Sequence, residues 1–282
     1  MSHIRVMTVY LLLLGLILPE NSHGESVSGL FAVSGFGPNA MYQIPLPALN
    51  VLFRGNVPTS VNLWELEQGP DAKTAYSYYR QGDSLYLLDL ETTSVLSAVT
   101  VDTNMFNNGR GFAAAPDGTL YGIFLNSQLR TIDPQTGSTS FVANISGLGT
   151  SSVAGPEAMT FGPDGTLYVA ASPGNRWGRN LYTMNLSNGL LTQIGPIGSS
   201  FIDIDTLAFG PDGFLYGVDT VSGPNDLWRI DPRSGNRSFV LTLPAGINGL
   251  HFAVIPLPSA AWMGMILLGG VAVIGALRRR CS

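Results

Sequence analysis

The chain has 282 residues, of which 45% are apolar and only 12% carry a charge, so it is long enough to bury a full core. Its 34 Gly and 18 Pro are more turn-forming residues than a helical protein tolerates. Asp and Glu outnumber Lys and Arg by 19 to 14, and a surface of this sign repels phosphate backbones, so we expect no nucleic-acid partner.

Residues 1–24 have the pattern of a secretory signal peptide. Arg5 gives the segment a positive charge, an apolar core runs from Val6 to Leu18, and small residues precede a cleavage point after Gly24. The alternative is an uncleaved membrane anchor, but an apolar core of about 13 residues is short for a bilayer. We therefore expect export of the chain and removal of this segment.

The strongest signal in the chain is internal repetition. Three segments share a Pro-Asp-Gly turn, and its glycine recurs at positions 118, 165 and 213, with periods of 47 and 48 residues. A second series with an Asp-Pro-x-x-Gly turn or a variant of it follows each of them, at Leu129–Gly137, Leu181–Gly189 and Leu227–Gly235, with a fainter copy at Leu85–Thr93.

Each repeat predicts four antiparallel strands. Apolar residues alternate with polar ones around the turns, which is the period of a strand. In the Pro-Asp-Gly turn, proline presets φ, aspartate bonds the nearby backbone and glycine takes a positive φ, and the second turn works in the same way. Four-stranded units of 40 to 50 residues are typical of β-propeller blades.

The length between residues 25 and 255 predicts five blades, and six blades is the alternative. Four blades are expected at 61–101, 110–145, 157–197 and 205–243. The fifth is split: a strand at 248–254 would join strands at 29–34 and 41–44, so that the two ends of the domain close the ring. The unit at 61–101 is the weakest, because residues 68–73 lack the Pro-Asp-Gly turn.

Residues 256–282 predict a C-terminal anchor. Ser259–Leu277 is an uncharged run of 19 residues, long enough to cross a bilayer, and Arg278, Arg279 and Arg280 follow it and would stay in the cytoplasm. Cys281, the one cysteine, lies beyond these arginines, so we expect neither a disulfide nor a thiolate metal site in the exported domain.

The repeats resemble those of secreted bacterial β-propellers, a resemblance that implies a fold and no particular activity. The segment from Ile255 to Trp262, with the apolar run and arginines behind it, resembles a PEP-CTERM sorting signal of the "VPLPxxxW" variety. That resemblance implies recognition of Pro256, Leu257 and Pro258 by an exosortase, an envelope transpeptidase, although Leu257 replaces the usual Glu. It implies an inner-membrane intermediate, then the cell envelope or surface, and an association with extracellular polysaccharide; the alternative is a plain membrane anchor.

Propeller geometry predicts where a ligand site lies. Both kinds of turn share one face, and the other connections share the opposite face. Six residues before each Pro-Asp-Gly proline stand Arg110, Glu157 and Asp205, and Asn248 opens the split blade by analogy. These four side chains are expected to surround the mouth of the central channel, or alternatively to cap strand ends or pair with one another.

Two loops on the same face complete the predicted site. One carries Arg176, Trp177 and Arg179, a combination that suits stacking on a sugar or a peptide, although Trp177 is alternatively a cover for a blade edge. The equivalent loop of the next blade carries Asp219, Asn225 and Asp226.

The sequence therefore predicts a surface or matrix protein that binds carbohydrate or protein without catalysis, cofactor or metal. One alternative is a glycoside hydrolase or lyase that acts on extracellular polysaccharide, with Glu157 and Asp205 as the paired carboxyl groups of a hydrolase. Another is a purely structural protein. The exported domain keeps a single histidine, His251, which argues against a histidine-rich zinc site and a Ser-His-Asp triad.

Overall fold

The computed structural model describes residues 26–35, 39–45, 49–79, 82–102, 111–124, 127–148, 156–172, 179–198, 203–219 and 225–256. Residues 27–255 form one compact unit. The predicted signal peptide (1–24), most of the predicted sorting tail and the run Ser259–Arg280 lie outside the described residues. The part of the chain that the structure describes holds no helix long and apolar enough to cross a membrane.

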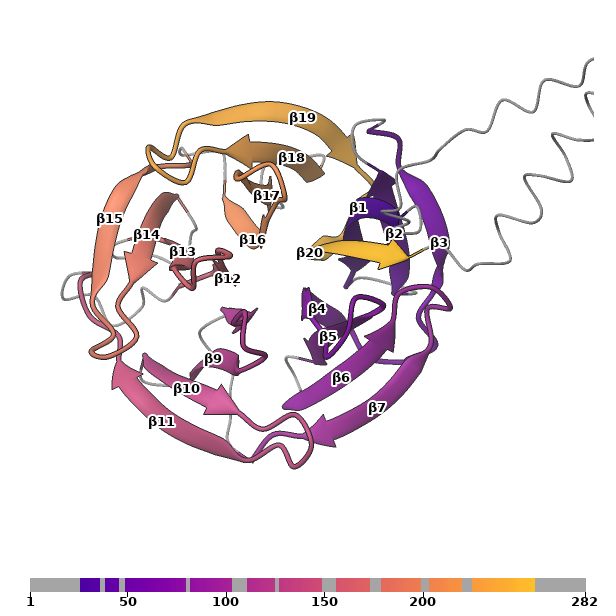
Figure 1. The fold of residues 1–282 in the computed structure, drawn as a ribbon, viewed down its shortest axis with the longest axis horizontal. Helices are drawn as coiled ribbons and strands as arrows, with labels where there is room; N and C mark the ends of the chain where they lie inside the picture. The colour runs from indigo at the N-terminus through magenta and orange to yellow at the C-terminus, as the bar shows by residue number, and fades with distance from the viewer. Residues whose placement is uncertain are drawn as a thin grey trace, which may run out of the picture. The chain divides into compact units, whose positions relative to one another are not determined.

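The described strands form five four-stranded antiparallel sheets arranged in a ring, each sheet being one blade (Figure 1). The first blade contains β20 (Ile247–Pro256), β1 (Ser26–Ser34), β2 (Ala40–Pro45) and β3 (Leu52–Asn56). The second contains β4 (Leu63–Gln68), β5 (Thr74–Tyr79), β6 (Ser84–Asp89) and β7 (Val95–Thr100). The third contains β8 (Phe112–Ala114), β9 (Leu120–Phe124), β10 (Gln128–Ile132) and β11 (Thr139–Asn144). The fourth contains β12 (Ala158–Phe161), β13 (Leu167–Ala171), β14 (Asn180–Met184) and β15 (Leu191–Pro196). The fifth contains β16 (Ile204–Phe209), β17 (Leu215–Asp219), β18 (Asn225–Ile230) and β19 (Arg237–Leu243).

Strands from both ends of the described chain complete the first blade. The last strand, β20, is its innermost strand and pairs with the first, β1 (Figure 1). The backbone N–H of Gly35 donates a hydrogen bond of 2.9 Å to the carbonyl of Gly246, which ties the two chain segments together near this pairing. The prediction of five blades with a split blade is confirmed, and the six-blade alternative is wrong.

The first hairpin turn of each repeat has the predicted chemistry. The three turn glycines adopt φ values of +80° to +86°, in the left-handed region that other residues rarely adopt. In the third blade, the Oδ1 atom of Asp117 accepts a hydrogen bond of 2.9 Å from the N–H of Thr119. The second blade lacks this motif, yet Asp71 accepts bonds from the N–H of Lys73 and the hydroxyl of Thr74, so the hairpin still forms.

The second hairpin turn joins neighbouring blades. The carbonyl of Gly137 accepts a 3.0 Å hydrogen bond from the N–H of Asp102, at the end of the preceding blade, and Gly189 does the same for Ser146. A Cβ atom at position 137 would lie 1.9 Å from the carbonyl oxygen of Thr100. Glycine is required here by the close approach of two backbones, in addition to its φ of +75°.

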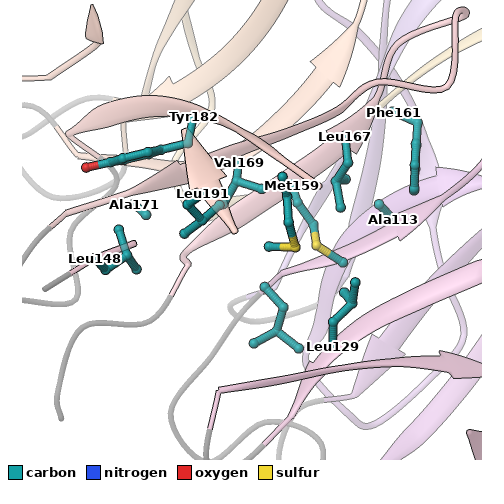
Figure 2. Packing of buried hydrophobic residues seen from close by; sticks show 12 residues of the cluster. Ala113, Leu129, Leu148, Met159, Phe161, Leu167, Val169, Ala171, Tyr182 and Leu191 are labelled. Carbon is teal, nitrogen blue, oxygen red and sulfur yellow. The ribbon is translucent and has the colours of Figure 1, made fainter. Parts of the chain in front are cut away.

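The core is divided among the interfaces between blades. The described residues form five clusters of buried apolar side chains, one between each pair of neighbouring sheets. Figure 2 shows the cluster between the third and fourth blades, in which Met159, Leu167 and Val169 pack with Ala113 and Leu129. A blade cannot bury its two faces alone, so the ring has to close before the core is complete.

Candidate functional site

The register of the two inner strands identifies one equivalent position in each blade. Glu67, Ala113, Thr160 and Ala208 each lie opposite a tyrosine of the next strand, namely Tyr76, Tyr121, Tyr168 and Tyr216. In the split blade the matching residue is His251, which follows Asn248 by the same three positions that separate Thr160 from Glu157. These five residues form one level along the central channel.

A pocket opens at the face that carries the hairpin turns. Its outer part has a volume of about 510 Å³ and is lined by Phe161, Phe209 and Phe252 together with the prolines of the Pro-Asp-Gly turns. A smaller recess of about 90 Å³ is lined by Glu67, Thr160 and His251, among other residues. The three phenylalanines line both hollows, so the recess is the base of the larger pocket.

The phenylalanine rings at the mouth are held by contacts between blades. Each packs on the tyrosine of the preceding blade, and the distances between ring centroids are 5.4 Å for Phe161 on Tyr121, 5.7 Å for Phe209 on Tyr168 and 4.9 Å for Phe252 on Tyr216. The other two blades carry Gln68 and Ala114 at this level. The aromatic wall is therefore fixed by the fold and covers three of the five sides of the mouth.

Glu67 is the buried carboxyl group at the base of the pocket. Only 4% of its surface is exposed, and its Oε2 atom accepts a 3.2 Å hydrogen bond from the N–H of Ala114 in the neighbouring blade. Its Oε1 atom is buried and has no hydrogen-bond partner among the residues that the structure describes. Burial raises the pKa of this carboxyl group well above its usual value, against the opposing effect of the Ala114 hydrogen bond.

His251 lines the recess from the first blade. Burial lowers the pKa of its imidazole to about 4, because the charged form loses hydration. The ring is therefore neutral near pH 7 and adds no positive charge to the pocket. The recess thus combines a carboxyl group with a neutral imidazole and the hydroxyl of Thr160.

The rim around the mouth is acidic. The turn residues Asp117 and Asp164 are exposed, and hydrogen bonds from the N–H groups of Thr119 and Thr166 hold the pKa of each carboxyl group below its usual value. The turn residue Asp212 forms an ion pair of 2.9 Å with Arg229. Asp117 and Asp164 are ionised at neutral pH, so each places a negative charge on the face at which the pocket opens.

At the opposite end of the channel, two described polar side chains meet across the axis. The hydroxyl of Thr206 in β16 donates a 2.7 Å hydrogen bond to Oε2 of Glu65 in β4, a strand of a blade that does not neighbour its own. Glu65 has a φ of +51° and lies in a bulge of β4, where the hydroxyl of Ser77 donates to the carbonyls of Trp64 and Glu65. Bulges redirect side chains, and this one allows Glu65 to reach across the channel.

Three of the predicted site residues lie at the starts of inner strands. Glu157 directly precedes β12, while Asp205 and Asn248 are the second residues of β16 and β20. Their exposed fractions are 1%, 5% and 3%, so little of each side chain is available to a ligand. Asp205 stands in a bulge, between the paired residues Ile204 and Thr206.

The loop residues of the predicted site are described only in part. Arg110, Arg176 and Trp177 lie outside the described residues. The backbone N–H of Arg179 donates a 3.1 Å hydrogen bond to the hydroxyl of Ser172. Asp219 and Asp226 lie opposite each other in β17 and β18; the first accepts a hydrogen bond from the N–H of Asp203 and the second from the hydroxyl of Thr242.

Sequence patterns alone did not single out Glu67, and they drew attention to His251 only as the one histidine of the exported domain. The residues that line the recess could have been found by counting three residues back from the turn proline, rather than six. At that position the repeats carry Ala113, Thr160 and Ala208, while Glu67 stands three residues before Pro70. Among the described residues, no group of three or more His, Cys, Asp or Glu side chains is placed to hold a metal ion.

Comparisons with known proteins place the chain in a family of repeats and among propellers. A family model described as "Repeat of unknown function (DUF6923)" matches residues 78–254. No curated protein is significantly similar to the chain in sequence.

Solved structures with a similar fold share little sequence with this chain. A chain of the nidogen/laminin complex is 13% identical with a TM-score of 0.52, over 80% of this chain and 98% of that one. TolB from Acinetobacter baumannii is 14% identical with a TM-score of 0.50, over 80% of this chain and 66% of that one. Hydrazine synthase from Kuenenia stuttgartiensis is 20% identical with a TM-score of 0.42; 66% of this chain matches, and it spans about half, 51%, of that one. The first two similarities, at these low identities, establish the fold alone.

Proposed function

This chain belongs to the DUF6923 family of repeats, and we propose that its propeller is a binding module, without catalysis, that holds part of a carbohydrate or protein partner in the pocket at the turn face. The observation that carries the proposal is the pocket itself. Its volume of about 510 Å³ lies within the range of roughly 300–1,000 Å³ that is common for ligand sites. Its aromatic wall is preorganised by tyrosines of neighbouring blades, which lowers the entropy lost on binding.

Burial of the candidate catalytic pair favours binding over hydrolysis. A glycosidase needs two carboxyl groups that reach the scissile bond. Glu157 and Asp205 are 1% and 5% exposed, so little of either carboxyl group is accessible to a substrate. A structure of similar fold comes from the nidogen/laminin complex, and a binding role is compatible with that similarity.

The sequence supports an exported location for this module. We infer that the signal peptide is removed after Gly24, that the tail anchors the chain by Ser259–Leu277, and that an exosortase recognises Pro256, Leu257 and Pro258. The partner would then be an extracellular polysaccharide or a surface protein. Mass spectrometry of the mature protein tests this proposal, because a chain that retains both ends would contradict it.

Binding is tested by retention of the full-length protein, purified in detergent, on arrays of glycans and peptides. Ala114→Phe places a phenylalanine where three blades already have one and fills part of the mouth. We expect it to weaken retention at least tenfold. Ala98→Phe, an exposed position on the outer strand β7, is the matched control and should leave retention unchanged.

The variant Trp177→Ala tests whether the ligand binds at the turn face or at the predicted loops of the opposite face. If it abolishes retention while Ala114→Phe does not, the ligand site lies on the predicted loops of the opposite face and the pocket assignment is wrong. If no glycan or peptide is retained by the unmodified protein, the proposal of a binding module fails.

A further inference from the structure

The base of the pocket contains a carboxyl group that the protein itself does not fully satisfy. The other blades carry alanine, threonine or histidine at this level, whereas Glu67 is only 4% exposed and its Oε1 atom has no hydrogen-bond partner among the described residues. Buried polar atoms in folded proteins nearly always have a partner, and an exception calls for an explanation. A bound group with a hydrogen-bond donor would supply the missing partner.

The described lining of the pocket offers Glu67 no positive charge. No Lys or Arg lines either hollow, and the imidazole of His251 is neutral near pH 7. An ionised carboxylate in so buried a place requires a counter-charge, because burial of an isolated charge is strongly unfavourable. A cation brought by the ligand would meet this requirement.

The walls and rim of the pocket favour a cation attached to an apolar chain. The faces of the rings of Phe161, Phe209 and Phe252 attract cations and also contact methylene groups. The ionised Asp117 and Asp164 at the rim raise the local concentration of positively charged ligands. One carboxyl group and one hydroxyl fall short of the roughly six to eight oxygen ligands of Ca²⁺, so a bare metal ion is disfavoured.

We propose that the recess binds a primary alkylammonium group, with Glu67 as its counter-ion and acceptor, Thr160 as a second acceptor and the three phenylalanines around the alkyl chain. This inference rests on the proposed binding function of the same pocket and names the chemistry of its ligand. The ammonium could be carried by a lysine side chain of a protein partner or by an amino sugar of a polysaccharide, since the two share this group.

The test compares n-hexylamine with n-hexanol, a neutral analogue of equal chain length, by isothermal titration calorimetry on the full-length protein in nanodiscs at pH 7.5. The amine should bind at least tenfold more tightly than the alcohol. Glu67→Gln should weaken the affinity for the amine at least tenfold and leave the affinity for the alcohol unchanged. Glu91→Gln, which alters a partly exposed carboxyl group paired with Lys73 at 3.2 Å, is the matched control and should change neither affinity.

Two further measurements guard against a folding defect in Glu67→Gln. The first is stability in urea: the variant should be at least as stable as the unmodified protein near pH 7, because it removes a carboxyl group whose ionisation is disfavoured by burial. The second needs no variant. Binding of the ammonium should be accompanied by proton release from Glu67, measured as a dependence of the binding heat on the ionisation enthalpy of the buffer.

Few titratable side chains line the recess in which Glu67 would release its proton. Among the described lining residues, β4 contributes Glu67 and β20 contributes His251, while β8, β12 and β16 contribute only residues that do not titrate, such as Ala114, Thr160 and Ala208. Since His251 has a pKa of about 4, proton release between pH 6 and 8 reports on Glu67.

The outcomes separate this inference from the proposed function. Equal affinity for the amine and the alcohol, or no proton release, would overturn the alkylammonium assignment while array binding left the binding module intact. Nα-acetyl-lysine amide and glucosamine distinguish the two sources: the one with the lower Kd identifies the partner as protein or polysaccharide, and binding of neither overturns the inference.

Discussion

The two ends of the central channel are built from the same repeat and differ in what fills them. At the end where the inner strands begin, Thr206 hydrogen-bonds Glu65 across the channel, and the carboxyl groups of Glu157 and Asp205 are buried. At the end where these strands enter the hairpin turns, three phenylalanines surround an open pocket with Glu67 at its base.

The two ends differ in how the inner strands pair. At the end where these strands begin, a bulge in β4 brings Glu65 to Thr206, and this hydrogen bond joins the ring across its centre. At the open end, regular pairing in four inner hairpins leaves space at the axis, and Glu67 lacks a partner for its Oε1 atom there among the described residues. A buried hydrogen bond that is satisfied stabilises the fold, whereas a buried polar atom without a partner is unfavourable.

The largest expected effect on stability is at the end where the inner strands begin. Gly249→Ala would place a Cβ atom 2.5 Å from the carbonyl carbon of Glu65 and 2.7 Å from its oxygen, and neither backbone segment moves easily. We expect a loss of about 3 kcal/mol in the free energy of unfolding, the upper part of the range for overpacking. Urea denaturation measures it.

The control for that variant is at the turn end. Gly213 has a φ of +80°, and a Cβ atom added there would meet no other atom within 4 Å, so Gly213→Ala introduces backbone strain alone, about 1 kcal/mol. An equal loss for both variants would show that the close approach of β20 to β4 does not limit the stability of the ring.

A smaller loss of stability is expected when a buried hydrogen bond is removed, and it should exceed the loss for an exposed hydrogen bond of equal length. Thr206→Val removes the 2.7 Å bond to Glu65 inside the channel and should lower the free energy of unfolding by about 2 kcal/mol. Thr242→Val removes an exposed bond of the same length to Asp226 and should change it by less than about 0.5 kcal/mol. Thermal unfolding of both variants compares them, and a similar small change in each would mean that the bond across the channel does not join the two blades.

The smallest effect concerns pH and the open end. The pKa of His251 is lowered to about 4 in the folded protein, so the unfolded chain binds a proton at this residue near pH 6.5 and the folded chain does not. Stability contributed by the neutral ring is therefore complete above about pH 6.5 and is lost as the pH falls toward 4.

The variant His251→Gln isolates this contribution from those of the carboxyl groups. The difference in the free energy of unfolding between the unmodified protein and the variant should change by about 1.8 kcal/mol between pH 7 and pH 5. A difference that stays constant over this interval would mean that the imidazole is hydrated and lies outside the recess.

The fold could be predicted closely because its signals are local. The turn glycines 118, 165 and 213 adopt the positive φ that the Pro-Asp-Gly motif requires, and the spacing of the motifs located the blade boundaries to within a few residues. The split blade could be predicted as well. A blade that lacks its innermost strand leaves a strand edge unpaired, and a strand from the other end of the domain is needed to pair with it. In the second blade, where the motif is absent, the side chain of Asp71 still bonds the hairpin turn.

The site could not be predicted as well, because burial depends on neighbouring blades. Counting six residues back from the proline found Glu157 and Asp205 at the starts of the inner strands, but it carried no information on how deeply each side chain lies. The bulge at Glu65 adds residues to one strand only, so its reach to Thr206, 141 positions later, has no counterpart in the repeat.

The strands, the turns and the number of blades could therefore be predicted from the sequence. They follow from the alternation of apolar and polar residues and from turn residues that set φ, and these residues lie within four or five positions of one another. Only the tertiary structure decided that a pocket lies at the turn end of the channel and that Glu67 lies at its base. Those properties arise from five strands, distant in the chain, that meet around one axis, and from the packing of each phenylalanine on a tyrosine of the blade before it.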